Sequence, residues 1–107
     1  MADRAALQRL REGRFFKGWD GAVASDRVEA SEASMRQLID ALLAAGPEID
    51  EDEARDAVGD CIDRFNELDD EGWINTIERE EIAEQIGRVV GLCGFEFDED
   101  WLDERDW

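Results

Sequence analysis

A regular row of carboxylates in the middle of the chain is the strongest chemical feature of the sequence. Between residues 53 and 70, acidic side chains recur every three or four positions, which places them on one side of an α-helix at about 100° per residue. This set is termed the acidic stripe and consists of Glu53, Asp56, Asp60, Asp63, Glu67 and Asp70. Like charges at this spacing cost about 0.2–0.5 kcal/mol per pair. Such a surface either binds a basic partner or serves only solubility.

The same sequence gives little support for catalysis. The chain has no histidine and no tyrosine, so the most common general base is missing. Its three serines, Ser25, Ser31 and Ser34, stand near an expected helix start and lack the glycine-bounded turn of a nucleophile elbow. Carboxylate pairs are so numerous that no pair stands out as an acid and a base. We therefore expect a protein that is not an enzyme and that carries no cofactor.

One loop has the spacing of a metal site. In the run from Glu67 to Glu78, a glycine stands at the sixth position, an isoleucine at the eighth and a glutamate at the twelfth. This run resembles an EF-hand calcium loop, and the resemblance implies ligands at Glu67, Asp69, Glu71, the Trp73 carbonyl, Asn75 and Glu78. It departs from the pattern at its first and fifth positions, which hold glutamates, and at Leu68, which the helical periodicity assigns to the core. An ordinary turn at Gly72 explains the same residues, so calcium binding is a further alternative and no metal site is predicted.

The acidic stripe belongs to a helix whose other side is apolar. The apolar positions repeat at steps of three and four and predict a buried face at Ala54, Ala57, Val58, Cys61, Ile62, Phe65 and Leu68. A short link, residues 69–75, leads to a second helix that starts near Thr76, with Asn75 or Thr76 as its N-cap, and ends at Gly94. With so short a link, the two helices should pack antiparallel or at a steep angle.

The rest of the chain also predicts helices. Residues 3–14 form a short basic helix, Phe15, Phe16 and Trp19 form a packed turn, and a long helix is capped by Ser25 or Ser31 and ends at Gly46. One or two helical turns are expected within residues 98–107. Together these patterns predict an all-α fold in which residues 1–107 form a single acidic domain, a small bundle of about four helices with a short C-terminal helical turn.

Two tryptophans near the C-terminus have two interpretations. Trp101 and Trp107 stand in a strongly acidic segment. They either pack back onto the body of the protein or act as exposed anchors for a partner, because tryptophan is common at the centre of protein interfaces. Together with the acidic stripe, they complete the set of candidate partner-binding residues.

The net charge of −18 limits the classes of partner. It disfavours direct binding of nucleic acid or of an anionic membrane, since both require a cationic surface. The charge is uneven, because residues 1–17 carry a balance of +3 and residues 18–107 carry −21. The basic N-terminal helix is therefore expected to lie against the acidic body of its own chain or of a second copy.

The sequence contains no apolar run of membrane-spanning length and no signal-like N-terminus. Its two cysteines, Cys61 and Cys93, fall on expected core faces and are interpreted as buried free thiols, which agrees with a cytoplasmic location.

The leading functional hypothesis is an acidic module that binds a basic protein, either a toxin or a nucleic-acid-binding protein. The stripe places a carboxylate about every 5 Å of helix, and one strand of duplex DNA places a phosphate about every 3.4 Å. The two densities are comparable without being matched. An inhibitor, an immunity protein or a nucleic-acid mimic would have such a surface. The alternative is a structural or self-associating helical protein whose acidity serves only solubility.

Overall fold

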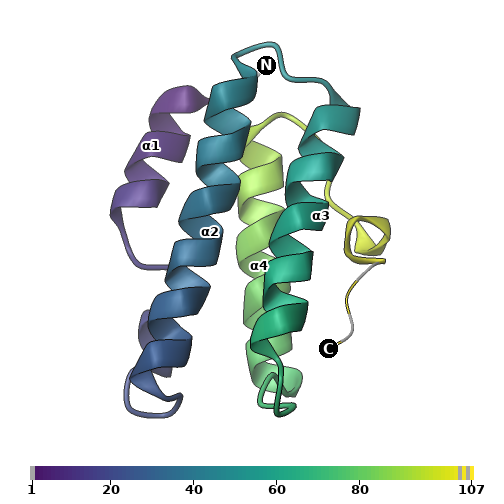
Figure 1. Ribbon diagram of the computed structural model, residues 1–107. Helices are drawn as coiled ribbons and strands as arrows, with labels where there is room; N and C mark the ends of the chain where they lie inside the picture. Colours follow the sequence, from purple (N-terminus) through teal and green to yellow (C-terminus); the bar gives the residue numbers. More distant parts are fainter. Residues whose placement is uncertain (1, 104, 106) are drawn as a thin grey trace.

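The computed structural model describes residues 2–103, 105 and 107 and shows an all-α fold. Its elements in chain order are α1 (Arg4–Glu12), the 3₁₀ turn η1 (Lys17–Trp19), α2 (Ser25–Ala45), α3 (Glu51–Leu68), α4 (Thr76–Leu92) and the 3₁₀ turn η2 (Glu99–Leu102). Successive α-helices run in opposite directions along the bundle, and η2 lies on the outer side of α3 (Figure 1). The predicted four-helix bundle with a short C-terminal helical turn is confirmed.

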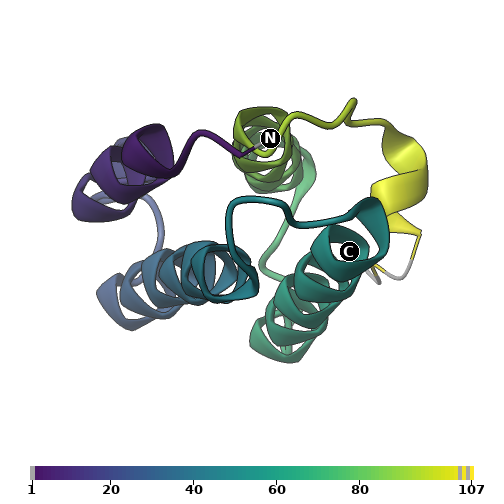
Figure 2. The same cartoon turned by 90° about the horizontal axis from the view of Figure 1, so that it is seen from above.

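Seen from the end of the bundle, α1 and η2 lie on opposite sides of the molecule (Figure 2). Between them, α2 and α3 form the closest helix pair, and α1 packs on α2 and α4. The N-terminus is tied to the end of α4, because the Asp3 N–H donates to the Leu92 carbonyl at 2.7 Å. The basic N-terminal helix thus lies on its own chain, which was one of its two predicted positions.

Two arginines of α1 form hydrogen bonds to α2. Arg11 donates two hydrogen bonds to Asp40, at 2.6 and 3.1 Å, and Arg4 donates to the Leu43 carbonyl. The hydrogen bonds from Arg11 hold the pKa of the Asp40 carboxyl below its usual value. Both partners of this pair are well exposed, so it contributes at most a few tenths of a kcal/mol.

One hydrophobic core contains residues from every helix and from both 3₁₀ turns. On α3 the predicted apolar face is confirmed, since all its positions except the partly buried Leu68 are buried. Phe15, Phe16 and Trp19 fill the core as predicted, and the Phe16 ring stacks on Trp19 with their centroids 4.2 Å apart. None of the helices among the described residues combines the length and apolar character that crossing a bilayer demands.

The helix ends explain where the sequence patterns succeed and where one fails. Asn75 caps α4 in a capping box with Glu78, and Gly46 ends α2 with φ of 98°, a conformation that favours glycine. The predicted serine caps of α2 are wrong, because the helix begins at Ser25 after an Ala24 cap that offers no side-chain oxygen. Ser31 lies inside the helix and is buried.

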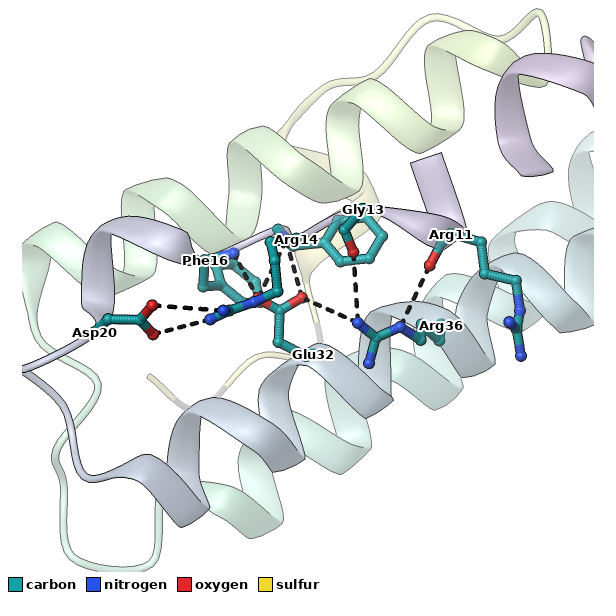
Figure 3. A network of polar contacts seen from close by, with 8 residues as sticks. Arg11, Gly13, Arg14, Phe16, Asp20, Glu32 and Arg36 are labelled. Atoms are coloured by element: carbon teal, nitrogen blue, oxygen red, sulfur yellow. Dashed lines mark hydrogen bonds and ion pairs between the residues drawn. The ribbon is translucent and has the colours of Figure 1, made fainter. Parts of the chain in front are cut away.

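A buried carboxylate joins the turn after α1 to α2. Glu32 is only 3% exposed, and its oxygens accept hydrogen bonds from the backbone N–H groups of Phe15 and Phe16 at 2.9 Å (Figure 3). The Arg14 guanidinium donates to the same carboxylate at 2.9 Å, and Arg36 lies 3.9 Å from it. Without Glu32, two backbone N–H groups beside the core would lose their acceptor, and such a loss costs about 1–3 kcal/mol.

We predict that Glu32→Gln lowers the free energy of unfolding by about 1.5–3 kcal/mol, because hydrogen bonds to a charged acceptor are replaced by weaker ones. Glu29→Gln is the matched control, since Glu29 lies three positions earlier on α2 and is exposed. Its effect should stay within about 0.5 kcal/mol. Urea unfolding of the three proteins measures the difference. Equal stability of the two variants would contradict the assigned role of Glu32.

Both cysteines are buried and free, as predicted. Cys61 lies beside Ser34, with 3.7 Å between the sulfur and the hydroxyl oxygen. Burial raises the pKa of the Cys61 thiol to about 11 because the thiolate is poorly solvated there.

The raised pKa predicts a loss of stability in alkaline solution. The unfolded chain releases the Cys61 proton near the ordinary value of 9.0, before the folded chain does. The contribution of this thiol is therefore fully present below pH 9.0 and is lost as the pH rises towards about 11. In urea unfolding at several pH values, Cys61→Ala should show a smaller alkaline decrease than the wild type. Identical slopes would contradict the prediction.

Candidate partner-binding site

The acidic stripe is fully displayed on the outer face of α3. All six predicted positions, Glu53, Asp56, Asp60, Asp63, Glu67 and Asp70, are exposed. Within the part of the chain that the structure describes, none of their side chains forms an ion pair. The helix therefore presents five uncompensated negative charges along one side, and Asp70 adds a sixth in the turn that follows it.

Six arginines form ion pairs among the described residues, and none of these pairs includes a carboxylate of the stripe. Arg14 pairs with Asp20 and Glu32, and Arg27 pairs with Glu71. On α3 itself, Arg55 pairs with Glu51, which lies outside the stripe, at 3.1 Å. Arg64 turns towards α2 and donates to the hydroxyl and the carbonyl of Ser34. The stripe thus lacks internal neutralisation even though α3 carries two cations of its own.

A groove runs along α3, and one part of it lies between α3 and η2. It consists of two adjoining hollows of about 270 and 360 Å³, which share Arg55, Asp56 and Gly59. The first hollow is completed by Asp100 and Asp103, and the second by Asp60 and Asp63. The groove is lined by Arg55, Asp56, Gly59, Asp60, Ile62, Asp63, Asp100, Trp101 and Asp103. Five carboxylates from two separate segments therefore surround one concave surface, termed the acidic groove.

An arginine of the chain already contacts the aromatic wall of the groove. The Arg55 guanidinium carbon lies 4.3 Å from the centroid of the Trp101 ring, which is a favourable cation–π distance. The indole N–H of Trp101 donates to the Glu96 carbonyl at 3.1 Å and fixes the ring. The groove thus combines carboxylates with an aromatic face, and both attract a guanidinium or ammonium group.

The two tryptophans are packed and not exposed. Trp101 is 5% exposed and Trp107 is 9% exposed, and the Trp107 ring meets Phe65 edge-on at 6.2 Å. The hypothesis that they act as exposed anchors is therefore corrected, because both rings are needed to cover the side of the core beside α3. Trp101 still lines the acidic groove, whereas Trp107 does not.

Comparison with protein-family models, with curated proteins and with solved structures finds no match for this chain. Its function is therefore inferred from its own geometry.

The loop that resembles an EF-hand uses its oxygens for other contacts. Asp69 accepts from the Ile74 N–H at 2.9 Å, Glu71 pairs with Arg27, and Glu78 accepts from the Asn75 N–H. Gly72 turns the chain with φ of 69°. Among the residues described by the structure, no group of three or more acidic or cysteine side chains is arranged to hold a metal ion. Residues 69–75 form the turn between α3 and α4.

A larger hollow lies away from the stripe, between α2 and the turn after α1. Its volume is about 470 Å³, and its charged lining includes Arg14, Asp20, Glu29, Glu32 and Arg36. In Figure 3 the Arg14 guanidinium bridges Asp20 and Glu32. Since most of these charges pair with one another, the hollow offers a ligand little uncompensated charge.

Sequence reasoning missed the part of the groove that comes from η2. Asp100 and Asp103 flank Trp101, and this spacing places both carboxylates beside the ring in a helical turn. The acidic residues were visible in the sequence. Their position against α3 depends on how the chain crosses the bundle after α4, which no local pattern specifies.

Proposed function

We propose that this chain binds a basic protein through the outer face of α3 and the acidic groove. One observation carries the proposal: within the described residues the six carboxylates of the stripe lack an ionic partner, although Arg55 and Arg64 of the same helix make their polar contacts elsewhere. Leaving like charges adjacent on a helix costs stability. A basic partner would remove this cost on binding.

The concave part of the surface supports a protein partner with protruding cationic side chains. A lysine or arginine entering the groove would meet the carboxylates of Asp56, Asp100 and Asp103. Candidate partners are a basic toxin and a nucleic-acid-binding protein. The chain would then act as an inhibitor, an immunity protein or a nucleic-acid mimic, in the cytoplasm where such targets occur.

The alternative of self-association through the N-terminal helix receives less support. Of the basic side chains before residue 18, Arg11 and Arg14 are already paired with carboxylates of the same chain, and Arg4 donates to a backbone carbonyl. Few cations on this side are therefore available to a second copy.

We predict that the triple substitution of Asp56, Asp60 and Asp63 by lysine weakens binding to the basic partner by about tenfold or more and reduces its dependence on salt, because the charge complementarity is inverted. The matched control changes Glu29, Glu80 and Glu84 to lysine, since these residues are exposed on α2 and α4 and give the same net charge.

The measurement compares elution of basic proteins from the three immobilised proteins in a salt gradient, followed by titration of the protein that the wild type retains. Circular dichroism confirms that both variants are folded. Equal retention by the stripe variant and the control would contradict the proposed surface.

A further inference from the structure

The acidic groove is complete only when the end of the chain lies on the bundle. The C-terminal segment, defined as residues 95–103 with Arg105 and Trp107, leaves the end of α4 and comes to lie along the outer side of α3 (Figures 1 and 2). It supplies Asp100, Trp101 and Asp103 to the groove. Without it, α3 would present only an open helix face.

Apolar contacts hold the segment in place at three positions. Phe97 packs on Gly87 of α4, Trp101 and Leu102 are buried against α3, and Trp107 contacts Phe65. The contact at Gly87 is especially close, since a Cβ atom there would lie 2.8 Å from the Phe97 ring. A side chain at position 87 would force the Phe97 ring to shift.

Electrostatic repulsion opposes these contacts. The segment carries Glu96, Asp98, Glu99, Asp100 and Asp103. It places Asp100 and Asp103 in the hollow that Asp56 lines, which adjoins the hollow lined by Asp60 and Asp63. Arg105 is paired with Glu99 within the segment, and Arg55 is the one cation that lines the described groove. Docking of the segment therefore brings like charges together and depends on its aromatic contacts.

We propose that the C-terminal segment is a charge-sensitive latch. When it is docked it completes the groove, and positive charge that enters the groove stabilises the docked position. This inference rests on the proposed function, because it assigns the regulation of the same site. Closing the latch and binding a basic partner favour each other by the same factor, as thermodynamic linkage requires. The apparent affinity of the partner is then reduced in proportion to the fraction of molecules whose latch is open.

Hydrogen exchange of the free protein tests the latch directly. The N–H groups of Trp101, Asp103 and Arg105 are hydrogen-bonded within the segment and report its docking. Raising the salt from about 0.01 M to 1 M shortens the Debye length from about 30 Å to 3 Å, so these amides should become roughly three- to tenfold better protected. An oligolysine peptide at low salt should have the same effect.

Two variants open the latch without changing any residue that lines the groove. Gly87→Ala forces the Phe97 ring aside, and Phe97→Ala removes the contact itself. Gly91→Ala is the matched control, because it lies one turn later on α4 and its Cβ would meet no atom within 4 Å. For the first two variants we predict faster exchange in the segment, and oligolysine binding that weakens to the extent that the closed fraction falls; the control should keep both values.

The outcomes separate this proposal from the proposed function. The latch would be overturned if protection of the segment depended on neither salt nor oligolysine. It would also be overturned if a variant whose segment has lost all protection kept the oligolysine affinity of the wild type. Failure of the proposed function has a different signature, namely equal affinity of the wild type and the stripe variant for the basic partner. Salt-dependent protection together with a parallel loss of protection and affinity in both opening variants supports the latch.

Discussion

The arrangement of the N-terminal third depends on the buried carboxylate of Glu32. Its oxygens accept hydrogen bonds from the backbone N–H groups of two consecutive residues, Phe15 and Phe16, and so fix the chain between the end of α1 and the aromatic turn. Phe16 is thereby placed against Trp19 on one side and Phe65 on the other. Phe65 in turn contacts Trp107, so a line of aromatic rings connects the first turn of the chain with its last residue. A carboxylate inside the protein is costly unless it is paired, and here its partners are two arginines and the backbone.

Glu32 also illustrates how the protein distributes its few cations. With 12 basic residues against 30 acidic ones, arginines cannot neutralise every carboxylate. Some arginines lie where an unpaired charge would be buried or where one helix packs on another: Arg14 pairs with Glu32, and Arg11 pairs with Asp40. Among the described residues, none of them pairs with a carboxylate of the acidic stripe. The negative charge of the stripe is thus a result of where the arginines are used as well as of the acidic composition.

The sequence predicted the helices well, because their apolar periodicity and caps are local properties. The buried face of α3 and the capping box at Asn75 follow directly from residue spacing. Glu32 was missed because its role depends on a segment sixteen residues away. The groove was half predicted: Asp56, Asp60 and Asp63 lie on a regular helix, whereas Asp100 and Asp103 reach it through a tertiary crossing. The burial of Trp107 likewise depends on a distant residue, Phe65.

The positions of α1 and η2 on opposite sides of the bundle give the molecule a further physical property. The N-terminal seventeen residues carry a positive balance, while the face formed by α3 and η2 carries unpaired carboxylates. The protein therefore has a permanent electric dipole that points across the bundle. In the field of a positively charged macromolecule such a dipole experiences a torque, and the molecule approaches with α3 foremost. Its shape and charge together would select productive orientations before any atoms touch.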